Sequence, residues 1–218
     1  MKSYDRAYFD RWYRDPRTRV HSPADVRRKV HMVVGVAEYM LGRAVRSVLD
    51  VGCGEGAWQP ILKRLRPAAR YQGVDPSPYA VRRFGRRRNI RLGSFERLDE
   101  AALDGPFDVV VCCDVLHYVP SAALARGLRH VRDLLGGVAY LEMYTSDDDI
   151  EGDVRGWRGR RPEFYRRLVR RAALTPCGLH CYLSAALARD AAALEKQGRG
   201  PRVEARVAGS DSEGFVRR

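Results

Sequence analysis

The stretch VLDVGCGEGAW, residues 48–58, joins an apolar run to three closely spaced glycines, and it decides the fold. The apolar run predicts a buried strand, and a segment of helical periodicity begins at Trp58. Between them stand Gly52, Gly54 and Gly56, where a backbone without β-carbons can turn sharply and lie directly against a ligand. The helix N-terminus that follows offers free N–H groups to a carboxylate or phosphate. The stretch therefore predicts a ligand-binding strand–turn–helix unit.

Short apolar runs alternate with segments of helical periodicity from residue 46 to residue 144. Pro67 and the pair Gly136-Gly137 are predicted to end helices, Pro78 to begin one, and Ser121 to cap one. The pattern predicts an α/β fold of the Rossmann-like, doubly wound type, a mostly parallel sheet with helices on both faces. The predicted strands are 48–51, 71–74, 90–92, 109–113 and 138–144, and the predicted helices are 58–65, 78–87 and 122–135.

The chain divides into three predicted parts. Residues 1–22 form an arm whose aromatic side chains are expected to pack on the domain as a hydrophobic cap or as a lid. Residues 23–197 form the ligand-binding domain, with further helices at 23–41, 162–173 and 185–196 and a sixth strand at 177–183. Residues 198–218 form a basic tail, either disordered or pairing a short edge strand at 203–207. The arm's aromatic residues are Tyr4, Tyr8, Phe9, Trp12 and Tyr13.

Composition places the chain among ordinary soluble globular proteins, with 45% hydrophobic and 31% charged residues in 218. No stretch approaches the roughly 18 apolar residues of a membrane span, and the N-terminus has no signal-peptide core, so we expect a cytoplasmic protein without membrane contact. The five cysteines are an odd number, which favours free thiols. Cys177, His180 and Cys181 stand close together, but no further ligands follow at a matching spacing, so no metal site is expected.

The formal net charge of +13 comes almost entirely from arginine, since only four of the 40 basic residues are lysines. Clustered arginine and lysine would indicate a nucleic-acid partner, because they bind phosphates. The arginines are instead scattered through every segment of the chain, as genomic base composition would distribute them. Charge alone therefore leaves a nucleic-acid partner possible but less favoured.

Two carboxylates stand at strand positions beside the glycine turn. Asp50 lies within the first predicted strand, and Asp75 ends the second, about twenty residues after the turn, where a carboxylate can accept both hydroxyls of a ribose. Asp75 could also be only a turn residue beside Pro76. The turn itself satisfies the dinucleotide pattern G-x-G-x-x-A as well, so these residues alone admit NAD or another nucleoside ligand.

The glycine turn, the two carboxylates and FDVVVCCDVLHYV at residues 107–119 together resemble the class I S-adenosylmethionine (SAM)-dependent methyltransferases of the small-molecule type. The resemblance covers residues 46–144, just under half the chain, and implies SAM as the cofactor. Many members carry an acidic residue where this chain has Ser94. The residues that the resemblance implies for SAM are Asp50, Gly52, Cys53 and Gly54 at its methionine part, Asp75 at its ribose, Pro76, Ser94 and Phe95 at its adenine, and Cys112 and Asp114 near its amino group and methyl.

His117, which the resemblance places near the methyl, is the candidate catalytic residue. It could take a proton from the acceptor or be only a hydrogen-bonded structural residue. The acidic residues between 147 and 153 form either a solvated loop or one wall for a cationic or amine acceptor, on which Trp157 could stack. The chain lacks the Asn/Asp-Pro-Pro-aromatic and Pro-Cys signatures of base methylation, so it predicts methyl transfer to N or O of a small molecule.

Three other functions stay open on the sequence. An RNA methyltransferase could use the basic surface. A NAD-dependent oxidoreductase would share the glycine turn, although the chain has no second substrate domain. A protein could also keep the SAM fold and bind SAM without catalysis. The sequence makes no prediction of the oligomeric state.

Overall fold

The computed structural model describes residues 4–197 and is built on a seven-stranded sheet of order β3-β2-β1-β4-β5-β7-β6. The predicted basic tail, 198–218, lies outside the described residues. The strands are β1 (Ser47–Val51), β2 (Arg70–Asp75), β3 (Ile90–Leu92), β4 (Phe107–Cys112), β5 (Leu135–Leu141), β6 (Thr175–Gly178) and β7 (Cys181–Leu183).

The five strands β3 to β5 run parallel, and β7 and β6 complete the sheet in antiparallel pairing. Val48 of β1 lies between Tyr71 of β2 and Val109 of β4. This arrangement confirms the doubly wound, mostly parallel α/β fold. The strand order reverses between β1 and β4, and in such sheets a crevice opens there at the carboxyl ends of the strands.

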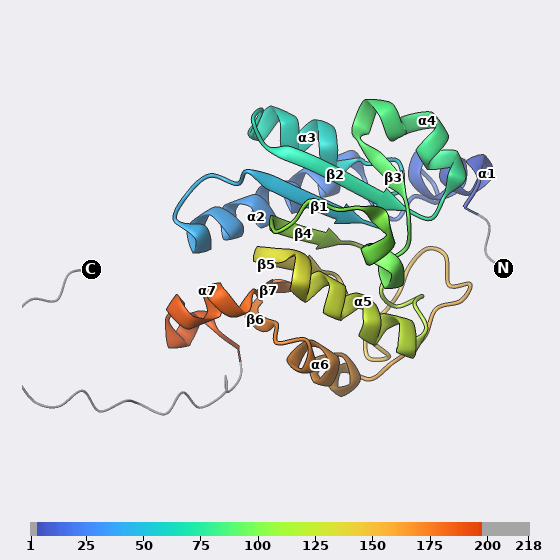
Figure 1. Cartoon of the computed structure of the whole chain (residues 1–218). Helices are drawn as coiled ribbons and strands as arrows, with labels where there is room; N and C mark the ends of the chain where they lie inside the picture. The colour runs from blue at the N-terminus through green and yellow to red at the C-terminus, as the bar shows by residue number, and fades with distance from the viewer. Residues whose placement is uncertain (1–3, 198–218) are drawn as a thin grey trace, which may run out of the picture.

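Helices cover both faces of the sheet, with α2, α3 and α4 on one face and α5 and α6 on the other (Figure 1). Strands that are covered on both faces are expected to be continuously apolar, and every residue of β1 and β4 is buried. The helical segments are α1 (Arg6–Phe9), η1 (Asp10–Arg14), α2 (Pro23–Leu41), α3 (Trp58–Leu65), α4 (Pro78–Arg88), η2 (Phe95–Ala101), α5 (Ser121–Leu134), α6 (Pro162–Arg171), α7 (Ala185–Asp190) and η3 (Ala193–Glu195).

Local sequence signals explain where the helices around the glycine turn begin and end. Ser22 and Asp25 form a reciprocal capping box at the start of α2. Ser77 accepts a hydrogen bond from the backbone of Ala80 at the start of α4, and Asn89 ends that helix in the left-handed conformation. Helix α3 has the predicted bounds and ends before Pro67. These caps fix the ends of α2 and α4, whereas α3 begins without a side-chain cap directly after the glycine turn.

The end of α5 differs from the prediction. The helix ends at Leu134, and β5 begins at Leu135 and runs through Gly136 and Gly137, which were expected to end the helix. A β-carbon on Gly137 would lie 2.2 Å from the backbone oxygen of Asp108, so this glycine serves close strand contact. Ser121 is the first residue of α5 and makes no side-chain cap, so that prediction was also wrong.

The C-terminal elements also differ from the prediction. Residues 177–183 were expected to form one strand, but they belong to two, because Leu179 and His180 adopt positive φ and make a tight turn between β6 and β7. The predicted helix 185–196 is broken into α7 and η3. Its alanines favour a helix, but neither piece has a fully buried residue, and only Leu187 and Ala188 of α7 pack partly against the core, which gives a longer helix little tertiary support.

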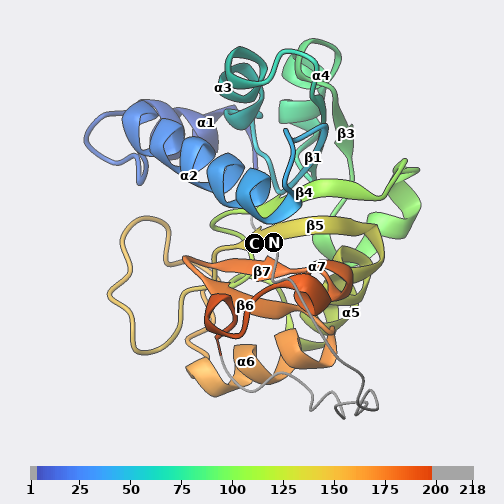
Figure 2. The same cartoon turned by 90° about the vertical axis from the view of Figure 1, so that its left-hand side faces the viewer.

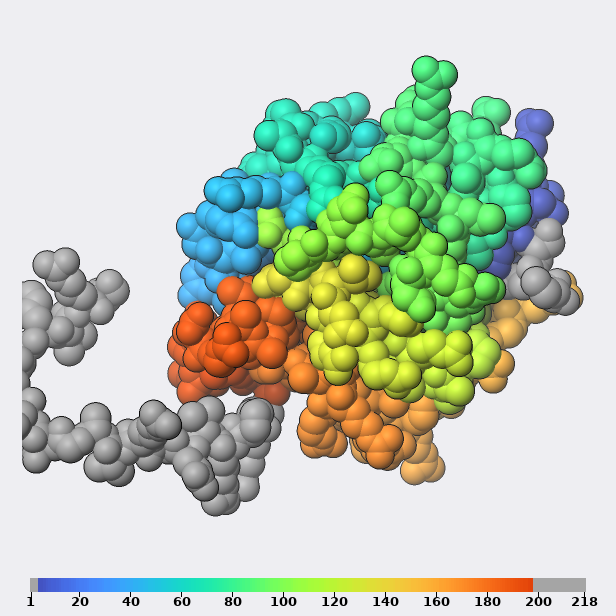
Figure 3. Space-filling model, in the orientation of Figure 1, coloured from blue at the N-terminus to red at the C-terminus, as the bar shows by residue number. Residues whose placement is uncertain are grey.

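Two chain segments meet at the carboxyl ends of the parallel strands. The arm around α1 and the loop between β5 and α6 both lie at the end of the sheet toward which the strands point (Figure 1). The β6–β7 hairpin extends the sheet beyond β5, with β7 paired to β5, and lies next to α6 (Figure 2). In the space-filling view, α4, η2, α5 and α6 make up much of the visible face, and the arm lies at the edge of this face (Figure 3). Within residues 4–197 no helix is long and apolar enough to cross a membrane.

Candidate active site

The glycine turn packs directly against the end of β4. Gly52 and Gly54 have φ of 70° and 54°, in the left-handed region that glycine adopts most readily. A β-carbon on Gly52 would lie 2.4 Å from the Val115 side chain, and one on Gly54 would lie 2.8 Å from the hydroxyl of Tyr13. Glycine is therefore required at both positions by the backbone and by the neighbours that close over it.

Asp75 holds the glycine turn through its buried carboxylate. Its Oδ2 accepts a hydrogen bond from the backbone N–H of Gly54 at 2.7 Å, and its Oδ1 accepts one from the N–H of Ser77 at 2.8 Å. Burial raises the pKa of Asp75 to about 6, although both backbone donors oppose the shift. Asp75 thus stabilises the turn beside Pro76, which was the alternative role open to it from the sequence. The ribose contact of the same two oxygens stays a prediction.

Asp50 is a second buried carboxylate, in the middle of the sheet. Its side chain accepts a hydrogen bond from the hydroxyl of Tyr71 at 2.8 Å, and within the described residues it has no ion-pair partner. Burial is the main cause that raises the pKa of Asp50 to about 7, with Asp75 adding to it. A buried carboxylate of this kind would be stabilised by a cationic group in the adjoining cavity.

A cavity of about 370 Å³ opens above the glycine turn. Of the predicted cofactor residues, it is lined by Asp50, Gly52, Cys53 and Asp114. Most of the other walls come from the arm, α2 and α3 and were not predicted from the sequence. For α3, its position directly after the glycine turn was the available signal. The remaining lining residues are Tyr8, Trp12, Tyr13, Val20, His21, Pro23, Val26, Ala57, Trp58, Pro60, Ile61, Arg88, Cys113, Tyr118 and Asp153.

A second cavity of about 230 Å³ adjoins the first. Its walls carry four carboxylates, and no lysine or arginine is among the described residues that line it. Asp114 belongs to both cavities, together with Val20, His21, Tyr118 and Asp153. The complete lining is Val20, His21, Asp114, His117, Tyr118, Tyr144, Asp149, Ile150, Glu151, Asp153 and Trp157.

His117 lies in the wall of the smaller cavity, behind Asp114. Its Nε2 is 3.3 Å from Oδ1 of Asp114, and its ring packs 4.2 Å from the ring of Tyr118 and 5.5 Å from that of Tyr144. Only 3% of the His117 side chain is exposed, against 38% of the Asp114 side chain. Its Nδ1 is buried without a hydrogen-bond partner among residues 4–197. Of this pair, Asp114 is the group that a ligand can reach.

Six of the predicted cofactor residues line neither cavity, and two of them, Gly54 and Asp75, are hydrogen-bonded to each other beside the glycine turn. Phe95 and Cys112 are buried in the hydrophobic core, where their side chains pack between the sheet and α5. Pro76 is exposed and Ser94 half-buried, both next to the ends of β2 and β3. Sequence position alone does not distinguish a side chain at a strand end that enters the core from one that faces the cavity.

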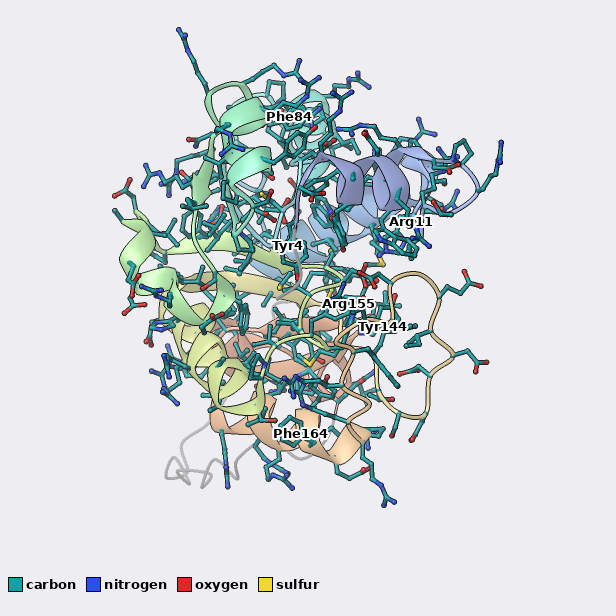
Figure 4. All side chains as sticks on the ribbon, turned by 90° about the vertical axis from the view of Figure 1, so that its right-hand side faces the viewer. Tyr4, Arg11, Phe84, Tyr144, Arg155 and Phe164 are labelled. Carbon is teal, nitrogen blue, oxygen red and sulfur yellow. The ribbon has the colours of Figure 1, made fainter. Side chains whose placement is uncertain are left out.

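The arm closes over the Asp75 side of the glycine turn. Its Tyr4 carbonyl accepts a hydrogen bond from the hydroxyl of Ser77 at 2.5 Å, and Phe9, 1% exposed, stacks on Tyr79 with ring centroids 5.6 Å apart. Arg14 forms an ion pair with Glu55 in the glycine turn. Figure 4 looks onto the carboxyl ends of the strands, with Tyr4 near the middle of this face and Tyr144 and Arg155 on the side of the acidic loop.

The cysteine-containing hairpin is separate from these cavities. All five cysteines are free thiols, and Cys181 is buried while Cys177 is half-buried. Within residues 4–197, no three or more histidine, cysteine, aspartate or glutamate side chains are placed to hold a metal ion.

The fold and the site together define a Rossmann-like nucleoside-cofactor domain with an adjoining cavity for a second ligand. The family model described as a methyltransferase domain matches residues 21–177, more than half of the chain. The chain therefore belongs to the methyltransferase domain family. It is a SAM-dependent methyltransferase, which removes NAD as the ligand of the glycine turn. No protein of curated function matches the chain in sequence.

Solved structures with the same fold include several methyltransferases. A SAM-bound amino pentose methyltransferase from Micromonospora echinaspora, involved in calicheamicin biosynthesis, has a TM-score of 0.60 at 18% identity, over 84% of this chain and 98% of that one. A sugar N-methyltransferase from a Streptoalloteichus species has a TM-score of 0.59 at 19% identity, over 73% and 88%. Magnesium protoporphyrin IX methyltransferase from Synechocystis, with bound SAM, has a TM-score of 0.55 at 17% identity, over 83% and 93%.

Proposed function

We propose that the chain transfers the methyl group of SAM to the nitrogen of a small amine. The observation that carries this proposal is the negative charge of the residues that line the smaller cavity. Asp114, Asp149, Glu151 and Asp153 line it, whereas the chain as a whole has a net charge of +13. An acidic cavity in a basic protein attracts a cationic ligand and repels phosphates and carboxylates.

Aromatic side chains in the same cavity add to this preference. Tyr118, Tyr144 and Trp157 line it beside the carboxylates, and aromatic faces attract ammonium groups. The indole Nε1 of Trp157 is buried without a partner among residues 4–197, so it is available to an acceptor that carries hydroxyl groups. Two of the structures with the same fold are named as methyltransferases of an amino pentose and of a sugar nitrogen. A hydroxylated amine is the acceptor class that fits both observations.

The residues around the larger cavity fit SAM by their chemistry. The buried Asp50 suits the amino group of the methionine part, and the N-terminus of α3 suits its carboxylate. Asp75 would accept the ribose hydroxyls, with Pro76, Ser94 and Phe95 beside the adenine and the Cys112 backbone near the amino group. The complete set of proposed cofactor residues is Asp50, Gly52, Cys53, Gly54, Asp75, Pro76, Ser94, Phe95, Cys112 and Asp114.

The protein's contribution to the reaction is alignment, because SAM when bound supplies a methyl group already activated by its sulfonium. The acceptor nitrogen must lie in line with that methyl, at the boundary where the two cavities share residues. The nitrogen uses its lone pair to form the new N–C bond, and the electrons of the broken S–C bond stay on sulfur. Asp114 would face the nitrogen, with His117, the predicted catalytic residue, directly behind it. The described part of the arm, residues 4–22 of the predicted 1–22, would act as a lid that excludes water from residues 23–197.

A labelled-methyl experiment tests the amine. The protein is incubated with methyl-labelled SAM and separate pools of small amines, hydroxylated amines, phenols and RNA, and the label is located by mass spectrometry. We expect label on amine nitrogen and an increase of about tenfold in KM for the Glu151→Gln variant, because a cationic acceptor loses one attractive charge. Glu163→Gln, on the exposed surface of α6, is the matched control. Label confined to phenol oxygen or to RNA overturns the proposal.

Two further expectations belong with this function. The site is proposed to act without a membrane partner and in the cytoplasm, as the sequence composition indicates. A protein that binds SAM without catalysis would have no second cavity beside the glycine turn, and the acidic cavity of about 230 Å³ supports catalysis instead.

A further inference from the structure

We infer that Asp114, which the resemblance places among the cofactor residues, holds the acceptor nitrogen against the methyl group, and that His117 positions its carboxylate. The inference rests on the proposed amine methylation and deepens it. Three observations carry it: the position of Asp114 between the cavities, the exposure of its side chain, and the way in which His117 is buried behind it.

The position of Asp114 is the first observation. It lies directly after β4, at the point where the strand order reverses, and lines both the cavity above the glycine turn and the acidic cavity. A methyl group that moves from a ligand in the first cavity to a ligand in the second passes the residues that line both cavities. Asp149 and Glu151, by contrast, line only the smaller cavity. Asp153 lines both cavities too, but its Oδ1 accepts a hydrogen bond from the backbone N–H of Arg155, whereas Asp114 stands at the strand end itself. We therefore take Asp114 as the carboxylate that both ligands contact.

The surroundings of Asp114 are the second observation. Its side chain is 38% exposed, and two of the tyrosines beside it, Tyr8 and Tyr118, line the larger cavity as well. Burial, followed by Asp114 and Asp153, raises the pKa of Tyr118, so this phenol stays protonated and donates its hydrogen bond to the backbone oxygen of Asp153. The hydroxyl hydrogen of Tyr118 is thus already used, and the carboxylate of Asp114 is the group that accepts a hydrogen bond from the acceptor's N–H.

The state of His117 is the third observation. Nε2 of His117 lies 3.3 Å from Oδ1 of Asp114, and Nδ1 has no hydrogen-bond partner among residues 4–197. Nδ1 is also closed to solvent. His117 therefore orients the carboxylate through Nε2 and does not itself touch the acceptor.

These observations give each group a defined task. The carboxylate of Asp114 accepts a charge-assisted hydrogen bond from the acceptor's N–H and turns the nitrogen lone pair toward the methyl. The proton that nitrogen loses passes to solvent along the open side of Asp114. His117 keeps the carboxylate in place at a residue whose backbone, with φ of 57°, is already in an uncommon conformation.

The test uses sinefungin, an analogue of SAM that carries an amine-bearing carbon in place of the methylated sulfur. Its ammonium stands where the transferred methyl meets the acceptor. By calorimetry we expect the wild-type protein to bind sinefungin about tenfold more tightly than S-adenosylhomocysteine, because the ammonium makes a charge-assisted hydrogen bond to Asp114. Asp114→Asn and Asp114→Gly should abolish this preference and leave S-adenosylhomocysteine binding within about twofold. Asn and Gly both tolerate positive φ, so the variants keep the fold.

Matched variants separate this role from general charge effects. Asp147→Asn removes a charge from the acidic loop between β5 and α6, at a residue that lines neither cavity, and should keep the preference for sinefungin. His117→Gln keeps an N–H near the place of Nε2 and should retain the preference, whereas His117→Leu should lose it. A preference that survives in Asp114→Asn overturns the inference, as does an equal loss of both ligands. Because this readout is binding, it is independent of whether the wild-type protein methylates amines.

Discussion

Asp50 combines burial in the middle of the sheet with a place in the cofactor cavity. In the folded protein without ligand it keeps its proton up to about pH 7, whereas the same carboxyl in an unfolded chain loses it near 3.8. The folded state thus holds more protons than the unfolded state between these values. The contribution of Asp50 to stability therefore falls as the pH rises from about 4 to about 7, since the unfolded state gains more from ionisation of this carboxyl.

The amino group of SAM should draw the Asp50 proton off. At pH 7 the carboxyl is about half protonated, so binding of a cation beside it should release up to about half a proton per SAM. Calorimetry in two buffers of different ionisation enthalpy measures this release. Asp50→Asn should show none of this release, and it should flatten the fall of melting temperature between pH 4 and pH 7. Equal proton release in Asp50→Asn and wild type would show that another group binds the amino group.

Asp75 has two functions that one substitution can separate. Both of its oxygens accept backbone hydrogen bonds in the ligand-free structure, so Asp75→Ala should lower the melting temperature. If the same oxygens also accept the ribose hydroxyls, SAM affinity should fall about tenfold or more, because hydrogen bonds to a charged group are lost. The measurement is calorimetry at a temperature where the variant is folded. Asp133→Ala, at an exposed ion pair, is the control. An unchanged affinity rejects the ribose contact.

At the scale of elements, the arm is the segment that joins the two halves of the site. It contributes Tyr8, Trp12 and Tyr13 to the wall of the larger cavity and is held by contacts at Ser77, Tyr79 and Glu55. A ligand enclosed by these rings cannot leave the cavity until the arm moves. A terminal element held at the surface in this way opens at a lower free energy cost than the core.

Loosening the arm should therefore speed ligand release. Phe9→Ala removes the buried ring that stacks on Tyr79, and we expect S-adenosylhomocysteine to dissociate about tenfold faster, because lids of this kind gate product release. Stopped-flow fluorescence of the arm tryptophan follows the rate. Arg6→Ala, which removes only an exposed ion pair with Asp10, is the control. A lower melting temperature with an unchanged dissociation rate would make the arm a hydrophobic cap, the other function that its sequence predicts.

The sequence predicted those elements in which the hydrophobic periodicity agrees with the residues that begin or end a helix or strand. Helix α3 follows directly from the glycine turn and ends before Pro67, and β1 to β4 are short apolar runs between helices. The misses are cases in which a tertiary contact decides. Gly137 reads as a helix stop but is needed where β5 passes the backbone of Asp108, and the hairpin of β6 and β7 depends on two left-handed residues that are not glycine.

The candidate site was predicted in part for the same reason. Its residues next to the glycine turn, Asp50, Gly52 and Cys53, could be found from a pattern local in sequence. The walls from the arm and from α2 come from segments well before the glycine turn in the sequence and carry no motif. Phe95 and Cys112 have suitable positions at strand ends, but their side chains enter the core. The acidic cavity was visible as a charged loop, whereas its place opposite Asp114 needed the fold.

At the scale of the whole molecule, the charge of the surface and that of the acceptor cavity have opposite signs. With 36 arginines among its 40 basic residues, the chain should bind RNA loosely through phosphate contacts at low salt. RNA bound in this way should not be methylated, because its phosphate backbone is repelled from the acidic cavity by Asp114, Asp149 and Glu151. Binding of RNA and methylation of RNA are therefore separable properties of this chain.

This separation can be measured on one sample. RNA retention should fall steeply as salt rises from about 50 to about 200 mM, because counterion release drives it. Over the same range, methyl transfer to the amine should change little, since the acceptor is held inside a cavity where screening is weaker. RNA added at saturating concentration should neither carry label nor compete with the amine. Label in RNA, with a rate that follows the salt dependence of retention, would instead make the basic surface the acceptor site and leave the acidic cavity without a role in catalysis.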